Sequence, residues 1–282
     1  MDEPILSSLF YQALTELREE LQAIHRPTLP EILEEYLPLP RNAVFFGVAQ
    51  DGLPLLLDLG NAAVGSLLVI GDAGSGKTHL LRTVAHALVY AKDAATFRFV
   101  VITPRVEEWE DLRQAPHCDG VFAASASKAA DVIYALAARA HADREHEPST
   151  PQAGQGSPTP TAGKGFTLLL LDDLSLVQNL EYEIRLHLQW LLGRGPKRRI
   201  WTVATLTPQH FFDLQMLPWT GQFHTHLFAR VADSRQVQQF TQLLSLPPDP
   251  VLGELRPPAE YALVEGDHWL RFWNPEESGG RQ

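Results

Sequence analysis

Residues that mark secreted or membrane-bound proteins are scarce in this sequence. Its 282 residues include a single cysteine, Cys118, so no disulfide can form within the chain, and no charged and apolar signal peptide opens it. No apolar run approaches the roughly 20 residues that a membrane helix needs, and the strongest runs, 67–70 and 168–171, are typical of buried strands. We therefore expect a cytoplasmic protein with no membrane contact.

Positive charge is also scarce. Lys and Arg number 23 against 34 Asp and Glu, a formal net charge of −11, which argues against a whole surface devoted to nucleic-acid phosphates. The one dense basic stretch is 193–199, GRGPKRR. Hydrophobic content of 45% and charged content of 20% are ordinary for a globular protein, so we expect one large α/β domain with short additions.

The first 40 residues form a separate, helical extension in this interpretation. Apolar residues recur at three- and four-residue steps over 6–24, which predicts an amphipathic helix able to hold a protein partner. Prolines then punctuate a connector with one short helical stretch at 31–36. We expect the main domain to occupy 41–282, opening with an antiparallel hairpin of 44–49 and 53–59 around Asp51-Gly52.

Strands and helices alternate through the main domain. The expected strands are 66–70, 98–103, 166–171, 199–206 and 225–231, and the expected helices are 77–90, 128–142 and 181–192. This alternation predicts a mostly parallel sheet with helices on both faces. A second hairpin, 261–264 with 269–273, is expected to close the domain. Residues 147–165 contain almost nothing apolar and predict a disordered loop.

A phosphate-binding loop lies between the first parallel strand and the helix that follows. Residues 71–78, GDAGSGKT, match G-x-x-x-x-G-K-[ST] without a mismatch, in the strand–turn–helix context that the mechanism requires. The backbone N–H groups of the loop curl around phosphates, Lys77 reaches the β- and γ-phosphates, and Thr78 binds magnesium. We therefore predict ATP and Mg²⁺ as cofactors. The predicted nucleotide-binding residues are Gly71, Asp72, Ala73, Gly74, Ser75, Gly76, Lys77, Thr78 and His79.

Two aspartates follow the buried strand at 166–171, at the edge of the sheet where ligands bind. Asp172 is predicted to hold the magnesium, and Asp173 to orient or deprotonate the attacking water. The alternative is that both simply cap the strand end or the next turn. Thr205 ends a further strand and is predicted to sense the γ-phosphate, unless its hydroxyl only satisfies the sheet end.

Together these segments resemble one family, the FtsK/HerA-like DNA translocases, from about Phe46 to Trp273. The segments that carry the resemblance, in order, are SLLVIGDAGSGKT, VITPR, PHC, LLLLDD, ATLTP and HLFARVADSR. The resemblance implies a RecA-like, additional-strand P-loop NTPase that hydrolyses ATP. It also implies a hexameric ring of identical subunits acting on duplex DNA.

The departures from the family pattern affect hydrolysis more than binding. The family's catalytic glutamate falls on the shorter Asp173, and its sensor-region Gln and Arg fall on Leu206 and Thr207. The Asp after the second strand falls on Thr103, and an arginine of the fifth strand falls on His226. We therefore expect ATP binding with slow hydrolysis.

The resemblance further implies an arginine that completes the site of a neighbouring subunit. Arg194 is the predicted residue, with Arg198 and Arg199 near enough to compete and a solvated basic loop as the alternative. Two functions stay open at this point: a ring motor that moves DNA, or a nucleotide-dependent switch that holds a protein partner. An AAA+ loader would need a C-terminal helical lid, against which the closing hairpin argues.

Overall fold

The computed structural model describes residues 27–125, 127–145, 165–247 and 251–276. The helix predicted at 6–24 lies outside these residues, as does the loop predicted at 147–165 apart from Gly165. Across the described residues, no helix combines the length and apolar character needed to span a bilayer.

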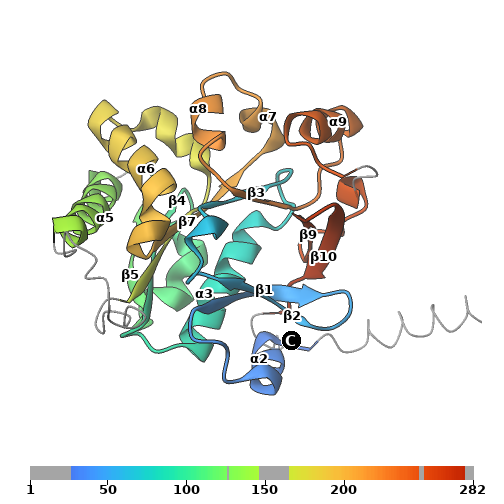
Figure 1. Ribbon diagram of the computed structural model, residues 1–282, viewed down its shortest axis with the longest axis horizontal. Helices are drawn as coiled ribbons and strands as arrows, with labels where there is room; N and C mark the ends of the chain where they lie inside the picture. The colour runs from blue at the N-terminus through green and yellow to red at the C-terminus, as the bar shows by residue number, and fades with distance from the viewer. Residues whose placement is uncertain (1–26, 126, 146–164, 248–250, 277–282) are drawn as a thin grey trace, which may run out of the picture.

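The described strands form a ten-stranded sheet in the order β2-β1-β10-β9-β8-β3-β7-β6-β4-β5 (Figure 1). Their bounds are β1 (Ala43–Ala49), β2 (Pro54–Asp58), β3 (Leu67–Ile70), β4 (Phe97–Thr103), β5 (Cys118–Ala123), β6 (Phe166–Leu171), β7 (Ile200–Leu206), β8 (Thr225–Phe228), β9 (Glu260–Glu265) and β10 (His268–Trp273). The stretch from β8 to β5 pairs in parallel, and β9, β10, β1 and β2 continue it antiparallel. The mostly parallel sheet and both predicted hairpins are confirmed.

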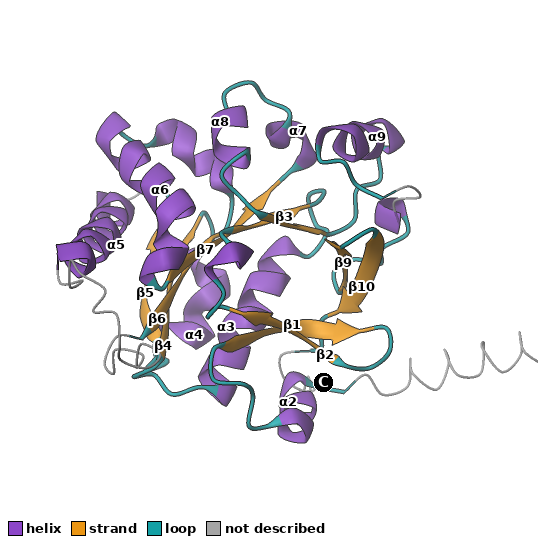
Figure 2. Cartoon of the chain, in the orientation of Figure 1, coloured by secondary structure: helices purple, strands orange, loops and turns teal. Residues whose placement is uncertain are grey.

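Helices cover both faces of the sheet (Figure 2). They are α2 (Leu29–Tyr36), α3 (Lys77–Ala91), α4 (Glu110–Arg113), α5 (Ser127–Glu145), α6 (Tyr182–Arg194), α7 (Pro208–Phe211), α8 (Leu217–Thr220) and α9 (Ser234–Leu243). Short 3-10 turns are η1 (Ala62–Val64), η2 (Val106–Trp109), η3 (Leu174–Asn179), η4 (Gly195–Arg198) and η5 (Val251–Gly253).

Alternating residues of the central strands supply the two cores, because successive side chains of a strand point to opposite faces. Leu68 and Ile70 of β3 pack with α5, α6 and α9, whereas Leu67 and Val69 pack with α3 and α4. Helix α2 packs on β1 and α3 through a smaller cluster that includes Leu33 and Phe45. The central strands are therefore buried on both sides, as their continuous apolar runs predicted.

The strand order explains the class of fold. Strand β7 lies between β3, which leads into the P-loop, and β6, which ends at the paired aspartates. It is therefore β7 that is the additional strand in space, although β4 is the strand that intervenes in sequence. This arrangement is the RecA-like, additional-strand fold that the sequence predicted.

Five described helices and strands were not predicted. Strand β5 is an edge strand whose pairing with β4 is irregular before Gly120, and α9 has a mostly polar sequence that begins after the capping Asp233, whose side chain accepts a hydrogen bond from Arg235 N. The other three are the one-turn helices α4, α7 and α8. Strand β8 is also shorter than expected and ends at Phe228. Beyond it, Ala229 N donates to Ile70 O, and Arg230 O accepts a hydrogen bond from Asp72 N in the P-loop.

Candidate nucleotide site

The P-loop joins β3 to α3 in a backbone conformation that depends on glycine. Gly74 and Gly76 have φ angles of 74° and 96°, in the left-handed region that other residues rarely adopt. Gly76 is also crowded: a Cβ there would meet Pro258 O and lie 2.8 Å from the hydroxyl of Tyr261. The positions of these glycines therefore follow from both backbone geometry and close packing.

The Lys77 amine lies over the P-loop. Its Nζ donates to the carbonyl oxygens of Gly71 (2.8 Å) and Asp72 (2.7 Å). Burial lowers the pKa of Lys77 from its usual 10.5, although the neighbouring carboxylates, led by Asp172, oppose the shift. Ser75 Oγ is buried in the same loop and has no hydrogen-bond partner among the described residues. The loop therefore holds the Lys77 cation, bonded to two of its carbonyl groups, and the buried Ser75 hydroxyl, which has no described partner.

Three hydroxyls converge on Asp172 at the carboxyl ends of neighbouring strands. Thr78 Oγ1 donates to Asp172 Oδ1 at 2.9 Å, and Thr103 Oγ1 donates to Oδ2 at 3.0 Å. Thr205 Oγ1 lies 3.4 Å from Oδ1. Asp172 itself is buried, with 4% of its surface exposed. Hydroxyl and carboxylate oxygens are the hard ligands that Mg²⁺ prefers, so Thr78 and Asp172 are the residues that would hold a magnesium ion here.

Asp173 sits in a constrained position beside this cluster. Its φ is 94°, unusual for a residue with a side chain, and its N–H donates to Thr205 Oγ1 at 2.8 Å. Its Oδ1 accepts a hydrogen bond from Ser175 N at 2.9 Å and so caps η3. The capping arrangement that sequence reasoning held as the alternative is therefore present, and the role of Asp173 as a base stays a prediction.

Arg105 belongs to the site and was missed from the sequence. Its Nη2 donates to Thr78 Oγ1 at 3.2 Å, and its Nη1 forms an ion pair with Glu108 Oε1 at 2.6 Å. Thr103, noted only as a departure from the family, also lies here as a partner of Asp172. Thr103 ends β4 and Arg105 lies just after it, so the rule that ligands bind at the carboxyl ends of parallel strands would have found them.

The C-terminal hairpin forms a wall of the P-loop. Tyr261 on β9 is fully buried, and its hydroxyl lies 2.8 Å from Gly76 O and 2.6 Å from Pro258 O. On the β8 side, Asp72 Oδ2 accepts a hydrogen bond from Ala232 N at 2.8 Å. No local sequence signal announces these contacts, because Tyr261 and Gly76 are 185 residues apart.

Arg194 is not brought to this cluster. It ends α6 and leads through η4 into the start of β7, so it lies toward the amino ends of the strands, whereas the P-loop follows the carboxyl end of β3. The basic stretch around it borders a hollow of about 580 Å³ at those amino ends, which Arg41, Lys197 and Arg199 help to line. The predicted residues therefore separate into one assembled group and one remote basic group.

Comparison with known proteins bears on the family and the fold. Residues 38–145 match the model of the FtsK/SpoIIIE family, a match that spans less than half of the chain. No curated protein matches the sequence.

Similar solved structures include ATPases of type VII secretion. The cytoplasmic domain of EccC from Thermomonospora curvata superimposes with a TM-score of 0.67 at 21% identity, over 90% of this chain and 32% of that one. ATPases 2 and 3 of the same EccC, in complex with a signal sequence peptide, superimpose with a TM-score of 0.60 at 16% sequence identity, over 85% of this chain and 41% of that one. ATPases 2 and 3 of EssC from Geobacillus thermodenitrificans superimpose with a TM-score of 0.63 at 17% identity, over 86% of this chain and 46% of that one.

The chain thus spans less than half the length of each of these structures, and at such identities the likeness establishes the fold. The resemblance expected from the sequence is confirmed: residues 38–145 carry the match to the FtsK/SpoIIIE family, on the fold of a P-loop ATPase.

Proposed function

We propose that this chain binds Mg²⁺-ATP at the P-loop and hydrolyses it slowly, as a subunit of a ring-shaped motor of FtsK/HerA type. One observation carries the proposal. Thr78 and Asp172 come from segments 94 residues apart, yet they share a 2.9 Å hydrogen bond beside the Lys77 amine. Such a hydroxyl–carboxylate pair next to a P-loop lysine is the arrangement that holds a magnesium ion and a triphosphate.

Each residue has a defined task in this proposal. Backbone N–H groups of the P-loop and Lys77 bind the β- and γ-phosphates, and Thr78 and Asp172 hold the magnesium ion. When bound, the ion neutralises charge that develops on the transferred phosphoryl group. Thr205 keeps Asp172 and the backbone of Asp173 in place through its hydroxyl.

Slow hydrolysis follows from the position of Asp173. One of its carboxylate oxygens already caps η3 through Ser175 N, and the side chain is one methylene shorter than the family's glutamate. The neighbouring Leu206, where relatives carry a polar residue, is buried and apolar. Poor alignment of the attacking water costs on the order of 10² in rate, because positioning is most of what the protein contributes to phosphoryl transfer.

The remote basic group supports a ring. Arg194 lies near the amino ends of the strands, so the nucleotide that it is proposed to serve is that of a neighbouring subunit. Arg194 is exposed on the surface, as a residue acting across an interface needs to be. We propose a hexamer of identical subunits on this basis.

Calorimetric titration tests nucleotide binding. Lys77→Ala removes the cation directed at the β- and γ-phosphates, so its affinity for Mg²⁺-ATP should fall clearly below that of the wild type. Lys92→Ala is the matched control, since Lys92 lies at the end of the same helix, bonded to Pro40 O at 2.7 Å. Equal affinity in Lys77→Ala and Lys92→Ala would refute the assignment.

Steady-state turnover tests the role of Asp173. Asp173→Glu should raise the rate, because the longer side chain extends past the cap at Ser175 N. Asp173→Asn, which keeps the cap acceptor and removes the charge, should abolish turnover with binding preserved. Loss of activity in Asp173→Glu with normal ATP binding would show that the site is adapted to aspartate or that another group is the base.

Duplex DNA is the proposed polymer, acting in the assembled ring. Six copies of a small basic patch converge on one axis, so retention of DNA should require ATP-dependent assembly. Neutralising Lys197 and Arg198 together should reduce retention at about 50 mM salt, where electrostatic binding is strong, and leave ATP binding unchanged. Particle mass in ATP, measured in parallel, shows whether the ring has formed.

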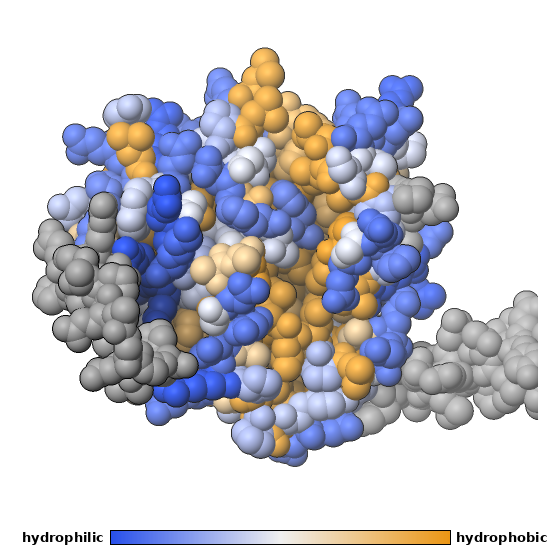
Figure 3. All heavy atoms as spheres, in the orientation of Figure 1, coloured by the Kyte–Doolittle hydropathy of each residue, from blue (hydrophilic) through white to orange (hydrophobic). Residues whose placement is uncertain are grey.

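A switch that holds a protein partner is the second candidate. The capped Asp173 and the net charge of −11 favour it. Figure 3 shows an apolar projection at the top of the molecule. In the segment from α7 to α8, Leu214 and Leu217 are 81% and 41% exposed, and residues 1–40 offer a further contact. A structural relative is known in complex with a signal sequence peptide, which gives a precedent for a peptide partner. An ATP-stabilised ring that retains no duplex DNA would favour the switch.

A further inference from the structure

Arg105 places a second cation at the P-loop. Its Nη2 lies 3.2 Å from Thr78 Oγ1, the hydroxyl that the proposed function assigns to magnesium. The Lys77 amine lies in the adjoining loop, bonded to the carbonyl oxygens of Gly71 and Asp72. Two cations from different segments, the one after β4 and the start of α3, thus lie at the same loop.

The base of Arg105 is held while its tip stays at the surface. The Arg105 N–H donates to Thr103 Oγ1 at 3.1 Å, and Arg105 O accepts from Glu108 N at 3.3 Å. The side chain is 54% exposed and its ion-pair partner Glu108 is 35% exposed. A surface ion pair of this kind contributes little and exchanges readily, so the guanidinium can turn toward a stronger anion.

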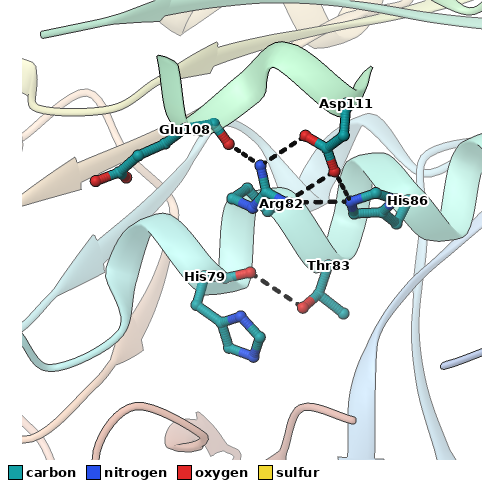
Figure 4. A network of polar contacts seen from close by, with 6 residues as sticks. All are labelled: His79, Arg82, Thr83, His86, Glu108 and Asp111. Atoms are coloured by element: carbon teal, nitrogen blue, oxygen red, sulfur yellow. Dashed lines mark hydrogen bonds and ion pairs between the residues drawn. The ribbon is translucent and has the colours of Figure 1, made fainter. Parts of the chain in front are cut away.

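A network anchors the segment that carries Arg105 to the P-loop helix (Figure 4). Arg82 of α3 contacts the backbone carbonyl of Glu108 and both carboxylate oxygens of Asp111, at 3.0 and 2.9 Å. His86 Nε2 lies 3.0 Å from Asp111 Oδ2. Bidentate arginine–carboxylate contacts fix orientation as well as distance. These contacts hold the end of η2 and the start of α4 against α3, and Arg105 immediately precedes η2.

We propose that Arg105 contacts the terminal phosphate of the bound nucleotide and makes the site selective for a triphosphate over a diphosphate. This inference rests on the proposed binding of Mg²⁺-nucleotide at the P-loop. A cation on the Thr78 oxygen repels the guanidinium, so Arg105 leaves that oxygen when magnesium binds. The γ-phosphate is then the strongest anion within reach, and guanidinium groups match phosphate geometry with paired donors.

The selectivity has a structural reason. Lys77 and the backbone of the P-loop serve the β-phosphate in both nucleotides, whereas Arg105 approaches from the side of Thr78 and Asp172, where a third phosphate lies. In relatives of this type polar sensor residues follow the additional strand, and here those positions are the buried Leu206 and the half-buried, uncharged Thr207. Arg105, just after β4, is placed to supply the charge that these positions lack.

The test compares two magnesium-bound nucleotides, β,γ-imido-ATP and ADP, by calorimetry. Arg105→Ala should lower the affinity for the imido analogue by about 10- to 100-fold, the effect of losing a charge-assisted hydrogen bond, and change the affinity for ADP by less than about threefold. The affinity of Arg105→Lys for the imido analogue should lie between those of the wild type and Arg105→Ala, because lysine keeps the charge and loses the paired N–H donors of the guanidinium. Thermal unfolding of each variant checks that the fold is intact.

Arg113→Ala is the matched control, since Arg113 forms the same kind of i,i+3 pair with Glu110, at 3.1 Å, in α4 of the same segment. It should leave both affinities unchanged. Equal weakening of both nucleotides by Arg105→Ala, no change, or tighter binding of the imido analogue would each overturn the inference. Lys77→Ala separates the two failures: if it binds both nucleotides as the wild type does, the proposed function itself is wrong.

Discussion

His226 should make the stability of this protein depend on pH below neutrality. It lies on β8 beside Leu68 of β3, and its Nε2 is sealed from solvent with no hydrogen-bond partner among the described residues. Burial, with a smaller contribution from the His224 charge, lowers the pKa of His226 from 6.5 to about 4. At this position relatives of the FtsK/HerA type carry an arginine, so the site has exchanged a permanent charge for a neutral ring.

The sign and size follow from proton linkage. Below pH 6.5 the unfolded chain takes up a proton at His226 and the folded chain does not, so stability falls as the pH drops from 6.5 toward 4. At pH 5.5, one unit below the unfolded pKa, the loss is about 1.4 kcal/mol. The largest loss in the free energy of unfolding, reached below pH 4, is about 3 kcal/mol.

Urea unfolding at pH 7.5 and pH 5.5 measures this loss. Other groups titrate in the same range, so the informative quantity is the pH-dependent change in the wild type minus that in His226→Gln. That difference should be about 1 to 1.5 kcal/mol, with the wild type losing more. His224→Gln is the control and should keep most of the wild-type loss. The same pH dependence in His226→Gln and the wild type would refute the reasoning.

Three further predictions concern the support of the P-loop. Tyr261→Phe removes the hydroxyl shared by Gly76 O and Pro258 O, which should cost about 1–3 kcal/mol in urea unfolding and weaken ATP binding in calorimetry. Gly76→Ala should destabilise the fold by about 1–3 kcal/mol or more from backbone strain and the contact with Pro258 O. Gly74→Ala, with φ 74° and nothing within 4 Å of the added Cβ, should cost less in the same assay. Thr205→Val leaves the Asp173 N–H without its acceptor, so turnover should fall more than the affinity for ATP, and an equal fall in both would contradict the assigned role.

Local patterns in the sequence carried much of the fold. The continuous apolar runs of β3 and β6 require burial on both faces, and the Asp51-Gly52 turn between apolar runs is a local signal for the β1–β2 hairpin. The P-loop could be recognised from the sequence for the same reason, since its glycines, Lys77 and Thr78 lie within one continuous motif of residues 71–78. Elements without such a pattern were missed: β5 depends on pairing with β4 at an edge, and α9 on packing that buries Val237 and Phe240.

The tertiary structure alone decided which side chains meet. From the sequence, Asp172 and Thr78 were assigned to one magnesium site by motif, but the third hydroxyl from Thr103, the cation of Arg105 and the wall formed by Tyr261 come from other strands and carry no spacing signal. The order of strands, with β7 between β3 and β6, determines these meetings. Local periodicity specifies which face of an element is buried, whereas strand order is settled by long-range pairing and core packing over the whole chain.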